Sequence, residues 1–158
     1  MFATMRLFQI TFCIPALCLA AMAQTKPPAP CSLLTAAEIQ QITGGAVTEA
    51  TPNKLNPSVC DYQMAGGSIL NVTVTAKGPA DSAEKMVSEL KKRNIKAEVV
   101  AGIGDGSYAS APGYGMQQSG AYKGSSHVIV TVLMAGTPEA KAKTTAQTLL
   151  KKAPTKVP

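Results

Sequence analysis

Apolar and polar residues alternate most clearly over residues 68 to 76, where threonine separates Val72 from Val74. A period of two predicts a strand with one buried face. The run from Val128 to Leu133 is mostly apolar, which is typical of a buried strand. Shorter runs of the same kind, separated by turn residues, bring the predicted strands to residues 47–50, 60–64, 68–76, 96–100, 106–109, 115–122 and 126–134.

Three segments have helical signals instead. Residues 81 to 94 repeat their apolar positions at the spacing of one helix face. These positions are Ala83, Met86, Val87 and Leu90. An earlier helix is predicted to begin at Thr35, because Glu38 follows three residues later and completes a capping box. The last helix is predicted to have Thr137 as its cap and Pro138 at its first position.

This order of elements predicts the α+β class: an antiparallel sheet of about six to seven strands with three helices packed on it. A weak repeat runs through the pattern. Residues 72–74, then Gly78 and a helix ending in two lysines, recur as residues 130–132, Gly136 and a helix ending in two lysines. An internal strand-strand-helix duplication and chance agreement between common strand-forming residues both explain this repeat.

The N-terminus has the pattern of a secretory signal peptide. Arg6 supplies a positive charge, residues 7–21 are largely apolar, and residues 21–23 (Ala-Met-Ala) predict cleavage before Gln24. A retained membrane anchor is the alternative, but the run is shorter than the roughly 18 residues needed to span a bilayer and contains Pro15. An acylated lipoprotein fits less well, because neither early cysteine follows a small residue.

Cleavage would leave one exported domain, in the periplasm or outside the cell, with no membrane span. Residues 1–23 are the predicted signal peptide and residues 24–30 a mobile, proline-rich lead-in. Residues 31–152 form the single predicted domain. Residues 153–158 contain two prolines without apolar periodicity, so this tail is predicted to fray.

Two cysteines, Cys31 and Cys60, remain in the predicted mature chain. An even pair in an oxidising compartment predicts a disulfide. A metal site is the alternative, but no further ligand lies at metal spacing and His127 is the only histidine. No metal or cofactor is therefore predicted.

Several short motifs carry a resemblance to a known group of proteins. They are Cys31-Ser-Leu-Leu-Thr-Ala-Ala-Glu, Cys60-Asp-Tyr and Gly102-Ile-Gly-Asp-Gly-Ser-Tyr. In this order the chain resembles small exported domains of unknown function, best known from actinobacterial lipoproteins, which have a PsbP- and Mog1-like fold. The resemblance implies pairing of Cys31 with Cys60 and a binding or interaction role, and it transfers no catalytic residues. The chain departs from that group in lacking a lipobox.

No catalytic motif is present, so the predicted role is non-enzymatic. His127, Asp105 and a serine could be assembled into a hydrolase site, but their spacing does not favour one, and no Gly-x-Ser-x-Gly turn exists. Residues 102–106 are rich in glycine, yet no helix is predicted directly after them. A tight turn is therefore favoured over a phosphate site.

Residues 102–120 are predicted to be rich in loops and to contact a partner, because tyrosine and methionine offer adaptable contact area. The candidate binding residues are Tyr108, Tyr114, Met116, Gln117 and Tyr122. The partner is expected to be a protein, or a small apolar ligand in a pocket between sheet and helices. The tyrosines could equally edge the core. The excess of 15 basic over nine acidic residues does not indicate nucleic acid, because the basic residues gather at helix ends.

Overall fold

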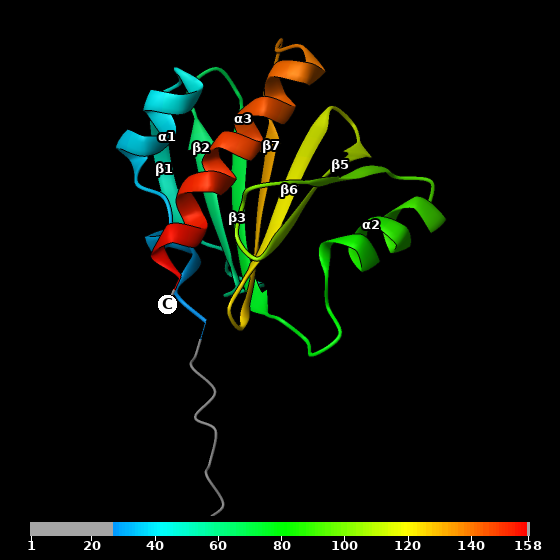
Figure 1. Cartoon of the computed structure of the whole chain (residues 1–158). Coiled ribbons are helices and arrows are strands. Elements are labelled where there is room, and N and C mark those ends of the chain that lie inside the picture. Colours follow the sequence, from blue (N-terminus) through cyan, green and yellow to red (C-terminus); the bar gives the residue numbers. More distant parts are fainter. Residues whose placement is uncertain (1–26, 158) are drawn as a thin grey trace, which may run out of the picture.

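The computed structural model describes residues 27 to 157, and these form one seven-stranded antiparallel sheet with three α-helices (Figure 1). The predicted signal peptide and part of the lead-in lie outside the described residues. The sheet order is β1-β2-β3-β7-β6-β5-β4. The strands are β1 (Val47–Pro52), β2 (Val59–Met64), β3 (Ile69–Ala76), β4 (Lys96–Val100), β5 (Gly106–Gly113), β6 (Met116–Lys123) and β7 (Ser126–Leu133). The predicted α+β class is confirmed.

One face of the sheet carries the main core. Alternate residues of β2, β3 and β7 point to this face and are buried. They are Cys60, Tyr62, Met64, Leu70, Val72, Val74, Val128, Val130 and Val132. Helices α1 (Ala36–Thr43) and α3 (Glu139–Lys152) cover them, with Ile39, Leu149 and Leu150 fully buried (Figure 1). The period of two along the strands and the apolar stripes of the helices therefore meet in this layer.

The third helix, α2 (Ala83–Lys92), packs on the opposite face over β4 and β5. It contributes Ala83 and Val87 to a second, smaller core that contains Tyr108 and Tyr122. The two helices that follow the repeated strand motif, α2 and α3, thus lie on different faces of the sheet. The internal duplication stays a prediction.

The helix caps follow local chemistry at two of the three N-termini. The predicted capping box of α1 is confirmed, since the backbone N–H of Glu38 donates to the Thr35 hydroxyl and that of Thr35 to the Glu38 carboxylate. Ser82 caps α2 with one bond only, since its hydroxyl accepts the backbone N–H of Lys85. The cap predicted at Thr137 is wrong, because α3 begins one residue later and Pro138 occupies the cap position without a side-chain bond.

The tail that was predicted to fray is ordered as far as it is described. Residues Ala153–Lys156 form a 3-10 helix, and Ala153, Pro154 and Val157 are buried against the main core. Lys156 pairs with Glu38 of α1 at 2.7 Å. The lack of an apolar repeat in residues 153–158 did not predict this packing, because a segment this short needs only a few apolar residues to pack against two helices. Pro158 lies outside the described residues.

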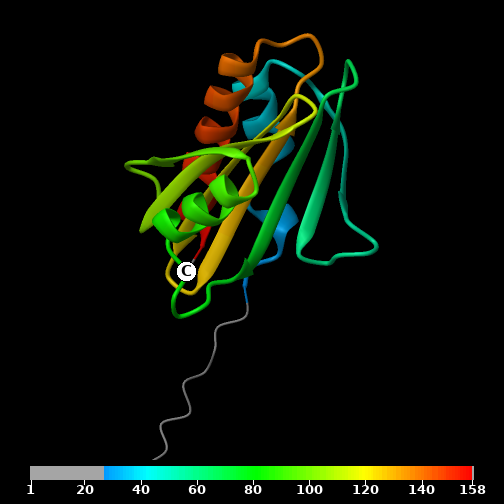
Figure 2. The same cartoon turned by 90° about the vertical axis from the view of Figure 1, so that its right-hand side faces the viewer.

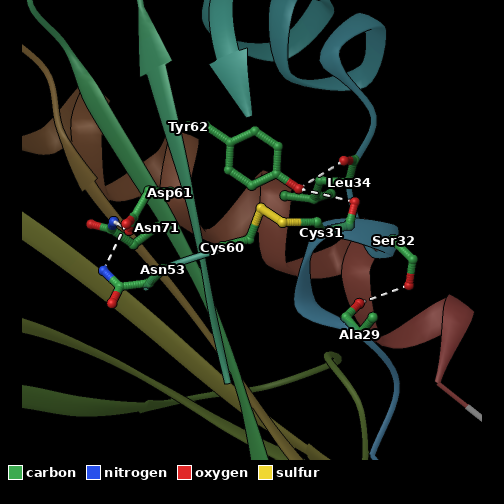
Figure 3. Close-up of a disulfide and its surroundings, with 9 residues drawn as sticks. All are labelled: Ala29, Cys31, Ser32, Leu34, Asn53, Cys60, Asp61, Tyr62 and Asn71. Carbon is green, nitrogen blue, oxygen red and sulfur yellow. Dashed lines mark hydrogen bonds between the residues drawn. A yellow bond between two sulfur atoms is a disulfide. The ribbon is translucent and has the colours of Figure 1, made fainter. Parts of the chain in front are cut away.

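Cys31 and Cys60 lie at disulfide distance, with their Cα atoms 5.0 Å apart (Figure 3). Cys31 belongs to a short 3-10 helix, η1 (Pro30–Ser32), and Cys60 to β2. The Tyr62 hydroxyl donates to the Leu34 carbonyl at 2.9 Å, and burial raises the pKa of Tyr62 to about 12. The disulfide and the tyrosine therefore fasten the segment before α1 to the sheet. No helix within residues 27–157 is long and apolar enough to cross a membrane.

Candidate functional site

The five candidate binding residues do not form one surface. Tyr108, Gln117 and Tyr122 are 1%, 3% and 2% exposed, so their side chains are unavailable to a macromolecular partner. Tyr114 is 94% exposed at the turn between β5 and β6, and Met116 is half-buried beside it. Residues 106–113 and 116–123 are strands, so the segment is less rich in loops than predicted.

Tyr108 and Tyr122 surround His127 in the smaller core. The Tyr108 hydroxyl lies 3.2 Å from His127 Nε2, and the Tyr122 ring stacks on the imidazole with centroids 4.3 Å apart. Burial lowers the pKa of His127, an effect that the charge of Asp81 partly opposes. Burial also raises the pKa of Tyr108 and of Tyr122. The cluster is a packed, neutral unit that helps to seat α2.

His127 and Asp105 are not arranged as a catalytic pair. The Asp105 carboxylate accepts the backbone N–H of Gly124 at 2.8 Å and lies 3.5 Å from the Lys123 ammonium, and these contacts lower its pKa. The hydrogen bond of His127 goes to Tyr108 instead. Within residues 27–157, no group of three His, Cys, Asp or Glu side chains is placed to hold a metal ion.

The side of β1, β2, β3, β7 and β6 that faces away from α1 and α3 carries no helix over most of its width (Figure 2). We call this side the open face. On β2 and β3 the residues that point to this side are half-buried or exposed, whereas the residues between them point to the other side and are buried. The residues of the open face are Glu49, Val59, Asp61, Gln63, Ile69, Asn71, Thr73, Met116, Gln118, Ile129, Thr131 and Leu133.

A row of polar side chains crosses the open face at right angles to the strands. Strand register places Asp61, Asn71, Thr131, Gln118 and Ser110 opposite one another in turn. The Asn71 amide donates to the Asp61 carboxylate, and the Gln118 amide donates to the Thr131 hydroxyl at 3.1 Å. Ser110 in turn donates to the Gln118 carbonyl oxygen at 3.3 Å. Most of these side chains are thus held in place by hydrogen bonds within the sheet.

Apolar residues flank this row on both sides. Ile69, Leu133 and Met116 are register neighbours on one side, and Ile69 is 43% exposed. Val59 and Ile129 lie in the next row on the other side. A polar strip with apolar margins gives this surface the mixed composition that is typical of non-obligate protein interfaces.

The loop between β1 and β2 borders the open face. Asn53 donates to the Asp61 carboxylate at 2.7 Å, on the side of β2 opposite the disulfide (Figure 3). Its side-chain oxygen accepts the backbone N–H groups of Leu55 and Asn56, which orders the loop. Leu55 at the tip is 96% exposed. The loop therefore presents a fixed, fully exposed leucine at the margin of the open face.

The open face is acidic, although the chain as a whole is basic. The sequence has 15 lysine and arginine residues against nine acidic ones. Among the residues of the open face the only charged ones are Glu49 and Asp61, and neither forms an ion pair within the described part of the chain. Asp61 is instead held by the amides of Asn53 and Asn71. The surface therefore offers two carboxylates to a cationic group.

The open face was not recognised in the sequence. The alternation in residues 68 to 76 correctly separated two sets of side chains, but no periodic signal reports which half of the sheet α2 will cover. A weaker signal was available. Asp61, Asn71 and Thr131 are polar residues that alternate with buried apolar ones, at matching positions in three predicted strands.

Comparisons with protein-family models, with curated proteins and with solved structures give no match for this chain.

Proposed function

We propose that this protein is an exported, non-enzymatic domain that binds another protein through the open face of its sheet. The observation that carries the proposal is the polar row from Asp61 to Gln118, flanked by apolar residues on the part of the sheet that α2 leaves uncovered. Such a flat, mixed surface suits a second protein surface, whereas a small molecule would require a concave site.

The charges of the open face point to a basic contact on the partner. Asp61 and Glu49 are the acidic groups on this surface, and neither is neutralised by a lysine or arginine of the described residues. Asp61 already has two amide donors, so it is positioned without being paired to a cation. A lysine or arginine from the partner would complete its shell with a charge-assisted hydrogen bond.

Site-specific photo-crosslinking in the producing cell tests this proposal. A photoreactive amino acid replaces Ile69 on the open face in the full chain, and Lys85 on the exposed side of α2 serves as the matched control position. We expect a discrete crosslinked protein from position 69 and none from position 85. The product should disappear when Asp61→Lys is added, and it should persist with Glu84→Lys on α2.

Equal products from the two positions, or no product from position 69 in cells that contain the folded protein, would exclude the open face as the binding surface. Persistence of the crosslink with Asp61→Lys would exclude the basic contact. Circular dichroism and thermal melting of each variant separate a lost contact from a lost fold.

Export is the second element of the proposal. It is supported by the N-terminal sequence pattern and by two cysteines at disulfide distance, which suit an oxidising compartment. N-terminal sequencing and intact mass of the accumulated protein test it. We expect a chain that begins at Gln24 and lacks two hydrogens relative to the reduced form. An intact Met1 in a reduced, cell-internal protein would refute export.

A further inference from the structure

A pocket of about 230 Å³ lies on the other side of the sheet from the open face, between the first turn of α3 and strands β4, β5 and β6. Small side chains, those of Ala109 and Ala111, leave room beside Gln117. Glu139 and Lys143 of α3 line it from above. This volume is several times the ~30 Å³ that one water molecule occupies in the liquid.

Gln117 is the polar group of this pocket without a partner. Its side chain is 3% exposed, and its carboxamide forms no hydrogen bond with any residue between 27 and 157. Two residues further along the same side of β6, the Ser119 hydroxyl is also buried without a partner among the described residues. Of these two residues only Gln117 lines the pocket, so a molecule bound there can supply the hydrogen bonds that its carboxamide lacks among the described residues.

The neighbouring glutamine shows the contrast. Gln118 points to the open face, where its amide donates to Thr131 and its oxygen accepts from Ser110. The two side chains have identical chemistry on opposite sides of one strand. Only Gln117 faces a pocket with its hydrogen-bonding capacity unused.

The pocket is also lined by one basic and one acidic side chain that form no ion pair within the described part of the chain. Lys143 of α3 is bound to Glu98 of β4 at 2.7 Å, which joins the helix to the sheet edge. Lys96 and Glu139 also line the pocket, and neither forms an ion pair within the described part of the chain.

We propose that this pocket binds a small zwitterion of the size of a free amino acid. Its carboxylate lies toward Lys96, its ammonium group toward Glu139, and its polar atoms hydrogen-bond to Gln117. A ligand with both charges satisfies both groups at the mouth, whereas a simple anion or cation leaves one of them unpaired. The pocket volume of about 230 Å³ favours a compact amino acid over a large aromatic one.

This site is independent of the proposed function. The pocket and the open face lie on opposite sides of the sheet, and the one residue of the polar row that also lines the pocket is Ser110 of β5. Photo-crosslinking at position 69 reports only on the open face. Either proposal can therefore fail while the other stands.

Nuclear magnetic resonance of the ¹⁵N-labelled mature protein tests the inference directly, because each glutamine side chain gives its own NH₂ signals. The signals of Gln117 and Gln118 are assigned by their loss in Gln117→Leu and Gln118→Leu. The 20 protein amino acids are then titrated singly to about 10 mM, which covers weak dissociation constants. Acetate, methylamine and acetamide are the single-charge and neutral comparisons.

We expect at least one small amino acid to shift the Gln117 NH₂ signals with saturation, while the Gln118 signals stay in place. Gln117→Leu and Lys96→Ala should each weaken binding at least tenfold, and Gln118→Leu should leave it unchanged. Gln117→Leu should melt at about the same temperature as the parent, since the amide that it removes has no hydrogen-bond partner among the described residues. Loss of binding together with retained stability would identify Gln117 as a ligand group.

Three results would overturn the inference. The Gln117 signals could stay unchanged with every amino acid, which would mean that the pocket holds only water. Acetate or methylamine could shift them as strongly as an amino acid, which would exclude a zwitterion. Gln117→Leu could bind as tightly as the parent, which would place the ligand elsewhere.

Discussion

Tyr108 and His127 come from β5 and β7, which are separated in the sheet by β6, and their side chains meet at 3.2 Å over the small residue Gly120. Gly120 is the register partner of both Tyr108 and Ile129, so a larger residue there would fill the space that the tyrosine ring occupies. Both residues are buried, with Tyr108 1% exposed and His127 6% exposed. The seating of α2 thus depends on a neutral histidine and on a glycine.

The first prediction concerns pH. Burial lowers the pKa of His127 in the folded protein, so the unfolded chain binds a proton more readily than the native state. The free energy of unfolding should therefore be highest above pH 6.5, the approximate pKa of histidine in the unfolded chain, and it should decrease as the pH drops below that value. Urea unfolding at about pH 7.5 and about pH 5.5 measures this difference.

His127→Gln is the control for this effect. His127 is the only histidine of the chain, so its removal should abolish most of the pH dependence in this range. A parent protein that is equally stable at both values would show that the imidazole is not held neutral by burial.

The second prediction concerns the carboxylate that joins α1 to the C-terminal segment. Glu38 accepts from the Thr35 backbone at 2.9 Å and from Lys156 at 2.7 Å, and these bonds lower its pKa to about 2. Its stabilising effect should be complete above about pH 4.5 and be lost as the pH falls toward 2. At neutral pH, Glu38→Gln should lower the free energy of unfolding by about 1 to 2 kcal/mol.

Glu49→Gln is the matched exchange on the exposed edge strand, and it should change stability by less than about 0.5 kcal/mol. Denaturant curves at neutral pH and near pH 3 compare the variants. Equal losses for Glu38→Gln at both pH values would contradict the assignment, because near pH 3 the Glu38 carboxylate of the unfolded parent is mostly protonated, and part of its stabilising effect is therefore already lost.

The third prediction concerns the disulfide. Cys31 and Cys60 are 29 positions apart, and closing a loop of that length stabilises a fold by about 3 to 4 kcal/mol on the chain-entropy model. The double variant Cys31→Ser/Cys60→Ser should lose about that amount in urea unfolding. The parent treated with a reductant should lose a similar amount, and an unchanged midpoint would show that the bond is absent from the purified protein.

The fourth prediction tests the glycine under the tyrosine ring. A Cβ atom at position 120 would lie 2.4 Å from Cζ of Tyr108, which is closer than non-bonded atoms approach. Gly120→Ala should therefore cost about 3 kcal/mol, at the upper end of overpacking effects. Gly45→Ala, whose Cβ would have its nearest neighbours at 3.8 and 4.0 Å, is the control and should change stability little. Equal stability of the two variants would mean that Tyr108 can move aside.

Much of the fold could be predicted from the order of apolar and polar residues, because the local preferences of these segments agree with their packing in the structure. The alternation around Val72 and Val74 predicted β3 almost to its ends, and the Thr35–Glu38 capping box predicted the start of α1. Strand β5 was predicted too short. Its second half, with Ser110 and Pro112, has low strand propensity and is held by pairing with β4 and β6, which a local pattern does not report.

The candidate site was predicted less well, for a related reason. Tyr108 and Tyr122 were selected for their side-chain chemistry, but α2 covers them, and the position of a helix over a sheet depends on contacts distant in sequence. Gln117 was selected as part of a surface and lies instead beneath α3. Residue type indicated that these positions are unusual, but the direction of each side chain required the complete sheet.

The link between η1 and β2 also has a mechanical consequence. Pro30 is buried at the start of η1. Cys31 directly after it is joined to Cys60 in an interior strand of the sheet (Figure 3). A pulling force on the chain before Pro30 would therefore reach β2 through the sulfur atoms. It would bypass α1, and the hydrogen bonds of β2 with β1 and β3 would bear the load together. Tension on this end of the domain would therefore be shared by two strand pairs in the interior of the sheet instead of peeling a single edge strand.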